Sequence, residues 1–173
     1  MNPSLKEKLE SAFSEIQVRI SETDRLIITV KKDSVLSILS FLKESGYDYL
    51  ALISCVDWIA EKRFEMVYIL SGYLQKDHEH PETEKATIIL KTRIARESPE
   101  VLTAIPIFKN AEPYERELHE LFGIEFEGHP RLTPLLLERA YPIPPFRKDF
   151  DTRKYVIDVF EKIPFLEDRI GNT

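Results

Sequence analysis

Residues 113–151 read PYERELHELFGIEFEGHPRLTPLLLERAYPIPPFRKDFD, and no other part of the chain is as dense in residues with special backbone or chemical properties. Asn110 can cap a helix that carries Pro113 in its first turn, and Gly123 is placed to end that helix with a positive φ. At helical spacing one face of this segment is apolar, so we expect it to pack inward. That face carries Tyr114, Leu118, Leu121 and Phe122.

The other side of the predicted helix is charged. Arg116 and Glu120 lie opposite the apolar face, four residues apart, where they can form an ion pair, and Glu115 and Glu117 flank that face. An exposed pair of this kind contributes under about 1 kcal/mol, so a solvated surface is one interpretation. The other interpretation is that a partner protein covers these charges.

After Gly123 the pattern changes from helical to irregular. Residues 124–126 are expected to be extended, and Gly128, His129 and Pro130 predict a turn. Four prolines exclude regular structure from much of residues 131–146, which are nevertheless rich in Leu, Tyr and Phe. Such a segment must wrap its own domain or be buried by a partner. Its end, Arg147, Lys148 and Asp149, suits ion pairing across an interface and equally a solvated surface.

Upstream, helical and strand-like segments do not alternate strictly, and hairpin connections dominate. Helical spacing occurs at residues 3–16 and 33–46, strand-like runs occur at 18–20, 25–31, 47–56, 63–70 and 85–93, and a polar loop is predicted at 72–84. Ser98 and Pro99 are expected to open a short helix with Val101, Leu102 and Ile105. The order predicts an α+β fold, in which helices pack on a mixed or antiparallel sheet. We expect an α+β domain over residues 1–126 and an extended, proline-rich, partner-binding arm over residues 127–173.

Composition narrows the functional classes. Of the 173 residues 43% are hydrophobic, and the net charge of −6 argues against a nucleic-acid binder and against docking on an anionic membrane. The single cysteine, Cys55, cannot form an internal disulfide, which favours a reducing compartment. No signal peptide or membrane span is recognised. Asn and Gln are scarce while Lys, Glu and Ile are plentiful, a combination that favours a thermophile.

Motifs for catalysis are weak. There is no phosphate-binding loop, no dinucleotide fingerprint and no nucleophile elbow. His78 and His80 form an H-x-H pair in a polar loop, and Glu115 and His119 are four residues apart, but neither arrangement supplies a full ligand set. A small stand-alone metal enzyme using His119 and His129 remains an alternative. The residues themselves favour a soluble α+β adaptor with no catalytic, cofactor-binding or metal residues.

The motif YERELHELFGIEFEGHPRL, followed by PFRKDF, resembles the C subunit, or thirty-kilodalton subunit, of bacterial NADH–quinone oxidoreductase, which is respiratory complex I. Relatives of that subunit occur in F(420)H(2) dehydrogenases and in membrane-bound energy-converting hydrogenases. The resemblance implies a non-catalytic subunit that carries no cofactor. It implies docking on a hydrogenase-like large subunit, near a small iron–sulfur subunit, on the cytoplasmic side of the cell membrane. Iron–sulfur clusters, and in some relatives a NiFe centre, are then expected in the partners.

The interface residues follow from the matching motif positions and from the charged helix face. They are Glu115, Arg116, Glu117, Glu120, Phe122, Gly123, Gly128, His129, Pro130, Arg147, Lys148 and Asp149. Some positions depart from the family pattern: Glu120 replaces Asp, and Thr133 and Pro134 replace Arg-Arg. These departures and the composition favour an archaeal, ferredoxin-linked hydrogenase or sulfur-reducing complex. An NADH- or F(420)H(2)-linked quinone or phenazine oxidoreductase is the alternative.

Overall fold

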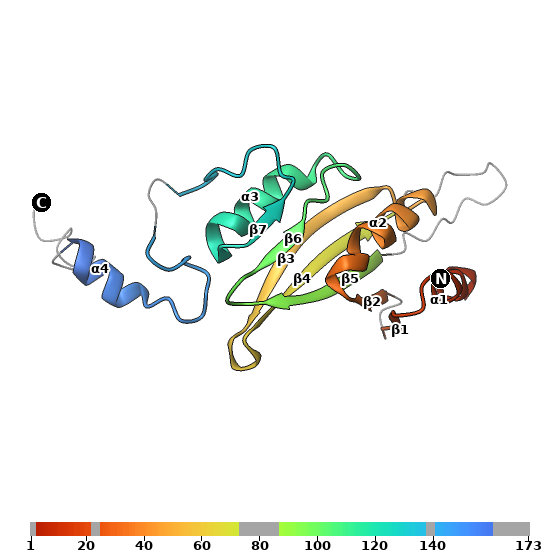
Figure 1. The fold of residues 1–173 in the computed structure, drawn as a ribbon, viewed down its shortest axis with the longest axis horizontal. Helices are drawn as coiled ribbons and strands as arrows, with labels where there is room; N and C mark the ends of the chain where they lie inside the picture. The colour runs from red at the N-terminus through yellow and green to blue at the C-terminus, as the bar shows by residue number, and fades with distance from the viewer. Residues whose placement is uncertain (1–2, 22–24, 73–86, 138–140, 161–173) are drawn as a thin grey trace, which may run out of the picture.

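The computed structural model describes residues 3–21, 25–72, 87–137 and 141–160. Its centre is a five-stranded sheet in the spatial order β1-β2-β5-β4-β3 (Figure 1). The strands β2 and β5 run parallel and the other neighbours run antiparallel, so the sheet is mixed, which is one of the two forms predicted. The strands are β1 Gln17–Ile20, β2 Leu26–Val30, β3 Tyr49–Trp58, β4 Arg63–Ser71 and β5 Thr87–Ala95.

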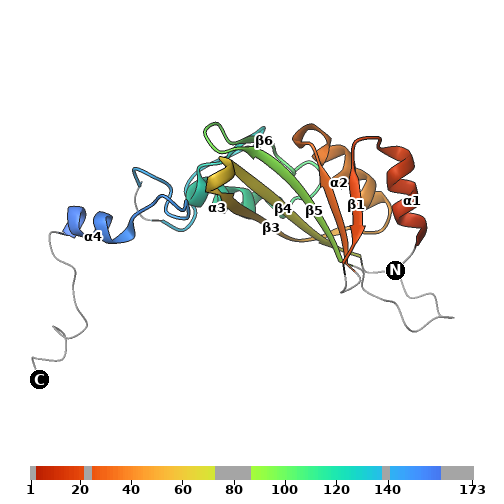
Figure 2. The same ribbon diagram turned by 90° about the horizontal axis from the view of Figure 1, so that it is seen from below.

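Three helices contribute to one continuous hydrophobic core with this sheet. The helices α1 Pro3–Ala12 and α2 Val35–Glu44 lie at the β1 end of the sheet, and α3 Ala111–Phe122 lies at the β3 end (Figure 2). Leu9, Ile38 and Leu39 are fully buried, because each sits on the apolar stripe of its helix. The short 3₁₀ turn η1 Lys32–Ser34 joins β2 to α2, and η2 Ile59–Glu61 joins β3 to β4.

The helix predicted after Pro99 is wrong. Residues 100–102 form strand β6 Glu100–Leu102, which pairs in parallel with β7 Glu125–Glu127 as a separate two-stranded sheet. Val101 is buried between two exposed neighbours, a period of two that suits a strand. Long-range pairing with residues 125–127 therefore outweighs the proline signal.

The starts of two helices also differ from the sequence-based expectation, which had one helix begin at residue 33 and the other be capped by Asn110. Asp33 lies inside η1, and Ser34 occupies the N-cap position of α2. Asn110 does stand at the N-cap of α3, but its side-chain amide donates to Leu50 O at 2.8 Å on β3. The asparagine thus ties the helix to the edge of the sheet instead of closing its own first turn.

Beyond β7, the described residues 128–137 and 141–151 are irregular, as the prolines predict. The chain then forms α4 Thr152–Phe160, which stands away from the sheet (Figure 1). This last helix was not expected from the sequence. Residues 73–86 and 161–173, with His78 and His80, lie outside the described residues, and so do the predictions made for them.

Candidate protein-docking site

Glu115 is not at the surface, in contrast to the sequence-based expectation. Its side chain is fully buried, with Oε2 accepting from Thr103 Oγ1 at 2.5 Å and Oε1 accepting from the Ala104 amide at 2.7 Å. Burial raises the pKa of this carboxyl to about 7, although both hydrogen bonds act in the opposite direction. Glu115 therefore fastens the turn after β6 to α3 and has no surface to offer a partner.

Arg116 and Glu120 bind the chain's own proline-rich segment. Arg116 Nε donates to Thr133 O at 3.0 Å and its Nη2 donates to Pro134 O at 2.8 Å. The carboxylate of Glu120 accepts from three successive amides, those of Leu135, Leu136 and Leu137, at 3.1, 2.8 and 2.7 Å. The expected ion pair between the two is replaced by these contacts, and Arg116 approaches Glu112 at 3.6 Å.

The charge state of Glu120 matches this role. Partial burial raises the pKa of its carboxyl, but the three amide bonds and the nearby Arg116 charge outweigh burial, so the pKa lies below its ordinary value. The segment forms no helix or sheet hydrogen bonds at these three amides, and the ionised carboxylate of Glu120 satisfies them instead.

Arg147 anchors the segment a second time, at the end of α3. Its Nε donates to Phe122 O at 2.7 Å, a carbonyl that the ending helix leaves without a partner. Its guanidinium also lies 5.3 Å from the ring centre of Phe64. Gly123 makes room: its φ is +72°, and a Cβ there would lie 3.0 Å from both Arg147 Nη2 and Pro144 Cγ.

A third anchor joins the arm to the end of the sheet. Arg96, directly after β5, forms a bidentate pair with Asp57 at 2.9 and 3.0 Å and also binds both oxygens of Asp149. The backbone amide of Lys148 donates to the same Asp57 at 2.9 Å. The Asp57 side chain is only 2% exposed, so Arg96 neutralises a buried charge. Through Asp149, the same guanidinium also fixes the arm to the end of the sheet.

Hydrogen bonds to its backbone hold the arm in place, while several of its apolar side chains are exposed. Leu136 is 63% exposed although its amide is bound to Glu120, and Phe146 is 59% exposed although its amide donates to Leu121 O. Leu135 and Ile143 are also exposed. We refer to Leu135, Leu136, Ile143 and Phe146 as the exposed arm side chains. Large apolar groups held in place at a surface are typical of protein-docking sites.

The two histidines serve the local backbone. His119 Nδ1 lies 2.9 Å from Ile124 O, and a carbonyl requires that this nitrogen carry the proton. In His129, Nδ1 accepts from the Arg131 amide at 3.0 Å while Nε2 faces Glu112 O at 3.3 Å. Across the described ranges, no group of three His, Cys, Asp or Glu side chains is arranged to hold a metal ion.

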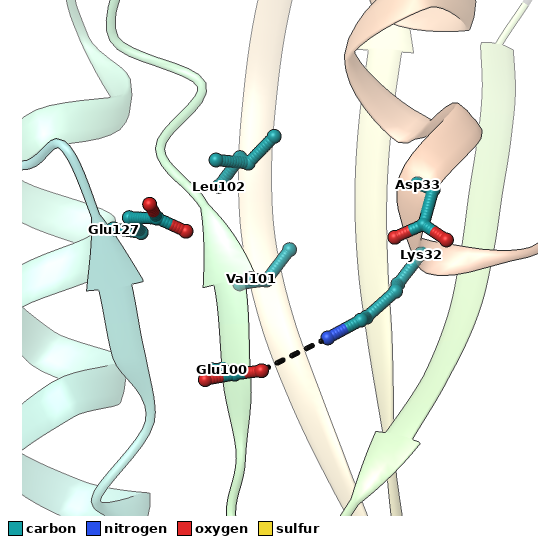
Figure 3. A pocket seen from close by; sticks show the side chains of 6 residues that line it. All are labelled: Lys32, Asp33, Glu100, Val101, Leu102 and Glu127. Carbon is teal, nitrogen blue, oxygen red and sulfur yellow. Dashed lines mark hydrogen bonds and ion pairs between the residues drawn. The ribbon is translucent and has the colours of Figure 1, made fainter.

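A pocket that involves none of the arm's anchor residues lies between η1 and the β6–β7 sheet. Lys32 Nζ donates to Glu100 across it at 3.2 Å, and Figure 3 shows Asp33 and Glu127 on opposite sides. These carboxylates do not converge on one point as metal ligands do. The pocket is lined by Lys32, Asp33, Glu100, Val101, Leu102 and Glu127.

The interface residues expected from the sequence therefore divide into two groups. Gly128, Pro130 and the Lys148 side chain are exposed, and Glu117 is half-buried. The remaining expected residues chiefly hold the arm or the core of this chain. They are Glu115, Arg116, Glu120, Phe122, Gly123, His129, Arg147 and Asp149.

The sequence of this chain matches a known protein family. Residues 28–156 match the family described as "Respiratory-chain NADH dehydrogenase, 30 Kd subunit". This range begins within β2 and includes β3, β4, β5, α3 and the residues that anchor the arm. The chain belongs to this family. The resemblance drawn from the motif is thereby confirmed, and this chain is a C-type subunit of a complex I-like membrane oxidoreductase.

Individual relatives extend the family match. The chain is 35% identical over 150 residues to the C subunit of the F(420)H(2) dehydrogenase of Methanosarcina mazei, and the match covers 86% of this chain and 88% of the relative. It is 36% identical over 127 residues to the C/D subunit of the NADH-quinone oxidoreductase of Bdellovibrio bacteriovorus, covering 72% of this chain. The chain spans only 21% of that longer C/D protein.

A solved structure shows the same fold over nearly the whole chain. This chain superposes with a TM-score of 0.79 and 28% identity on a chain of the membrane-bound sulfane sulfur reductase, an archaeal respiratory membrane complex. The match covers 93% of this chain and 91% of the other. In the part of the chain that the structure describes, no helix combines the length and the apolar composition that crossing a membrane requires.

Proposed function

We propose that this chain is a non-catalytic docking subunit in the peripheral arm of an ion-translocating, complex I-like oxidoreductase. Its partner at the exposed arm side chains is the hydrogenase-like large subunit, with a small iron–sulfur subunit nearby. The observation that carries the proposal is the pinned arm, in which Glu120, Arg116 and Arg147 fix the backbone while Leu136 and Phe146 remain exposed.

Preorganisation explains why such an arm suits docking. Ordering a free segment on binding costs free energy for every residue and side chain that loses freedom. Here the hydrogen bonds of Glu120, Arg96 and Arg147 already order the segment when the chain folds, so this cost is not added to the free energy of binding. Most of the free energy from burying the exposed arm side chains then remains for association.

The C/D relative supports the choice of the large subunit as partner. In Bdellovibrio bacteriovorus the name of one protein joins the letters C and D, and the part that matches this chain is about a fifth of that protein. Two parts of one polypeptide are held at a high effective concentration, which favours contact between them. We therefore assign the D-type part to the hydrogenase-like large subunit that this chain contacts.

The type of complex is proposed from the solved relative. The high coverage and TM-score of the sulfane sulfur reductase chain, together with the scarcity of Asn and Gln, favour a ferredoxin-linked sulfur-reducing or hydrogenase complex of an archaeal thermophile. The F(420)H(2) dehydrogenase of Methanosarcina mazei supports a second candidate. Reduced ferredoxin and F(420)H(2), offered separately to the purified complex, distinguish them by which donor is oxidised.

The proposal places all redox groups in the partners and the complex on the cytoplasmic side of the membrane. Elemental analysis of the purified free chain tests the first part. Less than about 0.1 zinc, iron or nickel per chain is expected, since His119 and His129 both engage backbone atoms. A stoichiometric metal that is lost in a His129→Ala variant would support the metal enzyme instead.

Co-purification tests the docking itself. Tagged chains carrying Leu136→Asp are expected to retain at least about tenfold less of the large subunit, because a charge would enter a desolvated contact. The control is Leu102→Asp, since Leu102 is also an exposed leucine, 45% exposed, but lies on β6. Equal recovery of the large subunit by both variants and the native chain would refute docking through the arm.

A further inference from the structure

The sheet has a second face that none of the described helices covers. Leu9 of α1, Ile38 of α2 and Leu118 of α3 all enter the single hydrophobic core on the other face. Strand side chains alternate between faces, so every second residue of β2, β3, β4 and β5 points away from that core. This second face, called the open face below, has its own composition.

An apolar row crosses the open face. The strand register places Ile27 of β2 beside Ile89 of β5, Ile89 beside Ile69 of β4, and Ile69 beside Leu52 of β3. The three isoleucines are half-buried and Leu52 is 38% exposed. A sheet face that meets water normally carries polar residues at such positions. Four aliphatic side chains in one row across four strands instead resemble the centre of an interface.

Trp58 and Val56 extend the apolar surface along the edge strand β3. Val56 is 39% exposed and Trp58 is 40% exposed, and both point to the same face as Leu52. The Trp58 ring lies 5.9 Å from the guanidinium carbon of Arg93 on β5. Tryptophan and arginine are among the residues most enriched at the positions that dominate binding energy in protein interfaces.

The charges of the open face are mainly basic. Glu65 is nearly buried at the centre and is held by Lys91 at 2.9 Å and Arg93 at 3.5 Å, and Arg93 also pairs with Glu61 at 2.7 Å. A buried carboxylate that already has its partners can be covered without leaving a charge unpaired. The register adds Arg19 and Arg63 to this face. In a chain of net charge −6, this one face therefore presents an excess of cations.

The dimensions suit a protein partner. The strands β3, β4 and β5 have 9 or 10 residues each, which at about 3.3 Å per residue gives a length of about 30 Å. The strands β1 and β2 are shorter, with 4 and 5 residues. With each of the five strands taken at its own length and a spacing of about 4.8 Å, the projected area is about 600 Å² before side-chain relief is counted. A standard interface uses about 800 Å² on each partner. The projected area of the open face thus approaches the area that one partner contributes to a standard interface.

We propose that the open face is a second docking surface, and that it receives a protein subunit whose contact surface is apolar at its centre and rimmed by carboxylates. This inference goes beyond the proposed function, because it concerns another face and a partner other than the large subunit. The apolar row supplies the desolvated centre, while Arg19 on the edge strand β1 and Arg63 at the start of β4 supply cations toward the rim. Lys91 and Arg93, on the central strand β5, keep Glu65 paired when the face is covered.

A charge placed in the apolar row tests the proposal. In the whole complex, isolated through a tag on the large subunit, Leu52→Asp is expected to reduce the recovery of the acidic-surfaced neighbouring subunit at least about tenfold. The control Ile20→Asp replaces a strand residue that is 52% exposed but belongs to the core-side register of β1. The affinity of the isolated chain for the large subunit should be the same for both variants and the native chain. That second measurement separates this proposal from the proposed function, which the Leu136→Asp variant tests.

Several outcomes would overturn the proposal. Full recovery of every subunit with Leu52→Asp would show that the open face contacts solvent in the complex. Loss of affinity for the large subunit would show that the face belongs to the site already described. A lower urea midpoint of the free Leu52→Asp chain, absent in Ile20→Asp, would show that the row is covered within the chain. Native-chain binding to phosphatidylglycerol vesicles or a native-chain dimer, if abolished by Leu52→Asp, would assign the face to lipid or to a second copy.

Trp58 offers an independent readout, because it is the only tryptophan of the chain. With 5-fluorotryptophan incorporated into this chain alone, one ¹⁹F signal reports the open face. On assembly of the whole complex, we expect the signal to shift and to lose its sensitivity to a soluble paramagnetic relaxation agent. An unchanged shift and unchanged relaxation in the complex would contradict the proposal.

Discussion

Replacing Glu115 by Gln should make the protein more stable at neutral and alkaline pH while leaving its fold intact. The carboxyl group is fully buried and bonds only neutral groups, the Thr103 hydroxyl and the Ala104 amide. A glutamine can reproduce both contacts, since its carbonyl accepts from the amide and its NH₂ donates to the hydroxyl oxygen. The substitution thus removes a buried ionisable group without removing its hydrogen bonds.

The magnitude follows from the pKa. Folding raises the pKa of Glu115 from its ordinary 4.5 to about 7, chiefly through burial. A raised pKa means that the folded state holds the proton more tightly, so the contribution of Glu115 to stability is fully present below pH 4.5 and is lost as pH rises to about 7. At 1.36 kcal/mol for each pH unit, the loss is on the order of 3 kcal/mol.

Urea unfolding of the native chain and the Glu115→Gln variant at pH 4.5, 6, 7 and 8.5 measures this loss. The difference in unfolding free energy between the two chains cancels the contributions of the other titrating groups. We expect it to shift in favour of the variant by about 3 kcal/mol across this range, with most of the change complete by pH 7.5. Glu117→Gln, on the same helix but half-buried, is the control and should show a far smaller shift. Parallel stability profiles for the native chain and Glu115→Gln would refute the reasoning.

Three further predictions concern the anchors of the arm. In Glu120→Ala, the amides that the carboxylate binds should exchange hydrogen for deuterium at least about tenfold faster, and unchanged exchange would show that the segment is held by other contacts. Gly123→Ala should lower the free energy of unfolding by about 2 kcal/mol in thermal unfolding, more than the control Gly46→Ala does. Both glycines have a positive φ, but only a Cβ at position 123 would meet other atoms within 4 Å, so equal losses would contradict this prediction. Arg96→Ala should cost about 3–5 kcal/mol by urea unfolding, because it removes the cation that pairs with the buried Asp57 carboxylate. The double variant with Asp57→Ala should recover part of that loss, and no recovery would place the role of Arg96 elsewhere.

Local patterns were sufficient for the sheet and for α3. The strand expected at residues 85–93 is β5, and Gly123 ends α3 with a positive φ, as predicted. Residues 100–102 were misassigned, because a strand of three residues depends on pairing with residues 125–127, which no local signal reveals. The helix α4 was missed because the apolar residues after 151 were interpreted as an extended arm.

The site was harder to derive from sequence than the fold. The motif located the right segment, but spacing on a helical wheel could not show that the chain would fold back over Arg116 and Glu120. Arg96 carried no signal at all, since its partner Asp149 is 53 residues away. Asp57 did carry one: a carboxylate on the inward side of an apolar strand requires a cation, and that requirement could have prompted a search for Arg96.

A photo-crosslink from the arm identifies the docking partner by direct contact. With p-benzoylphenylalanine in place of Leu136, irradiation of the whole complex should join this chain to the hydrogenase-like large subunit, because Leu136 is exposed on a backbone that Glu120 fixes. The same group in place of Leu102 on β6 should give at least about tenfold less of that adduct. An adduct from position 136 with a different subunit, or none with any subunit, would contradict docking of the large subunit on the arm.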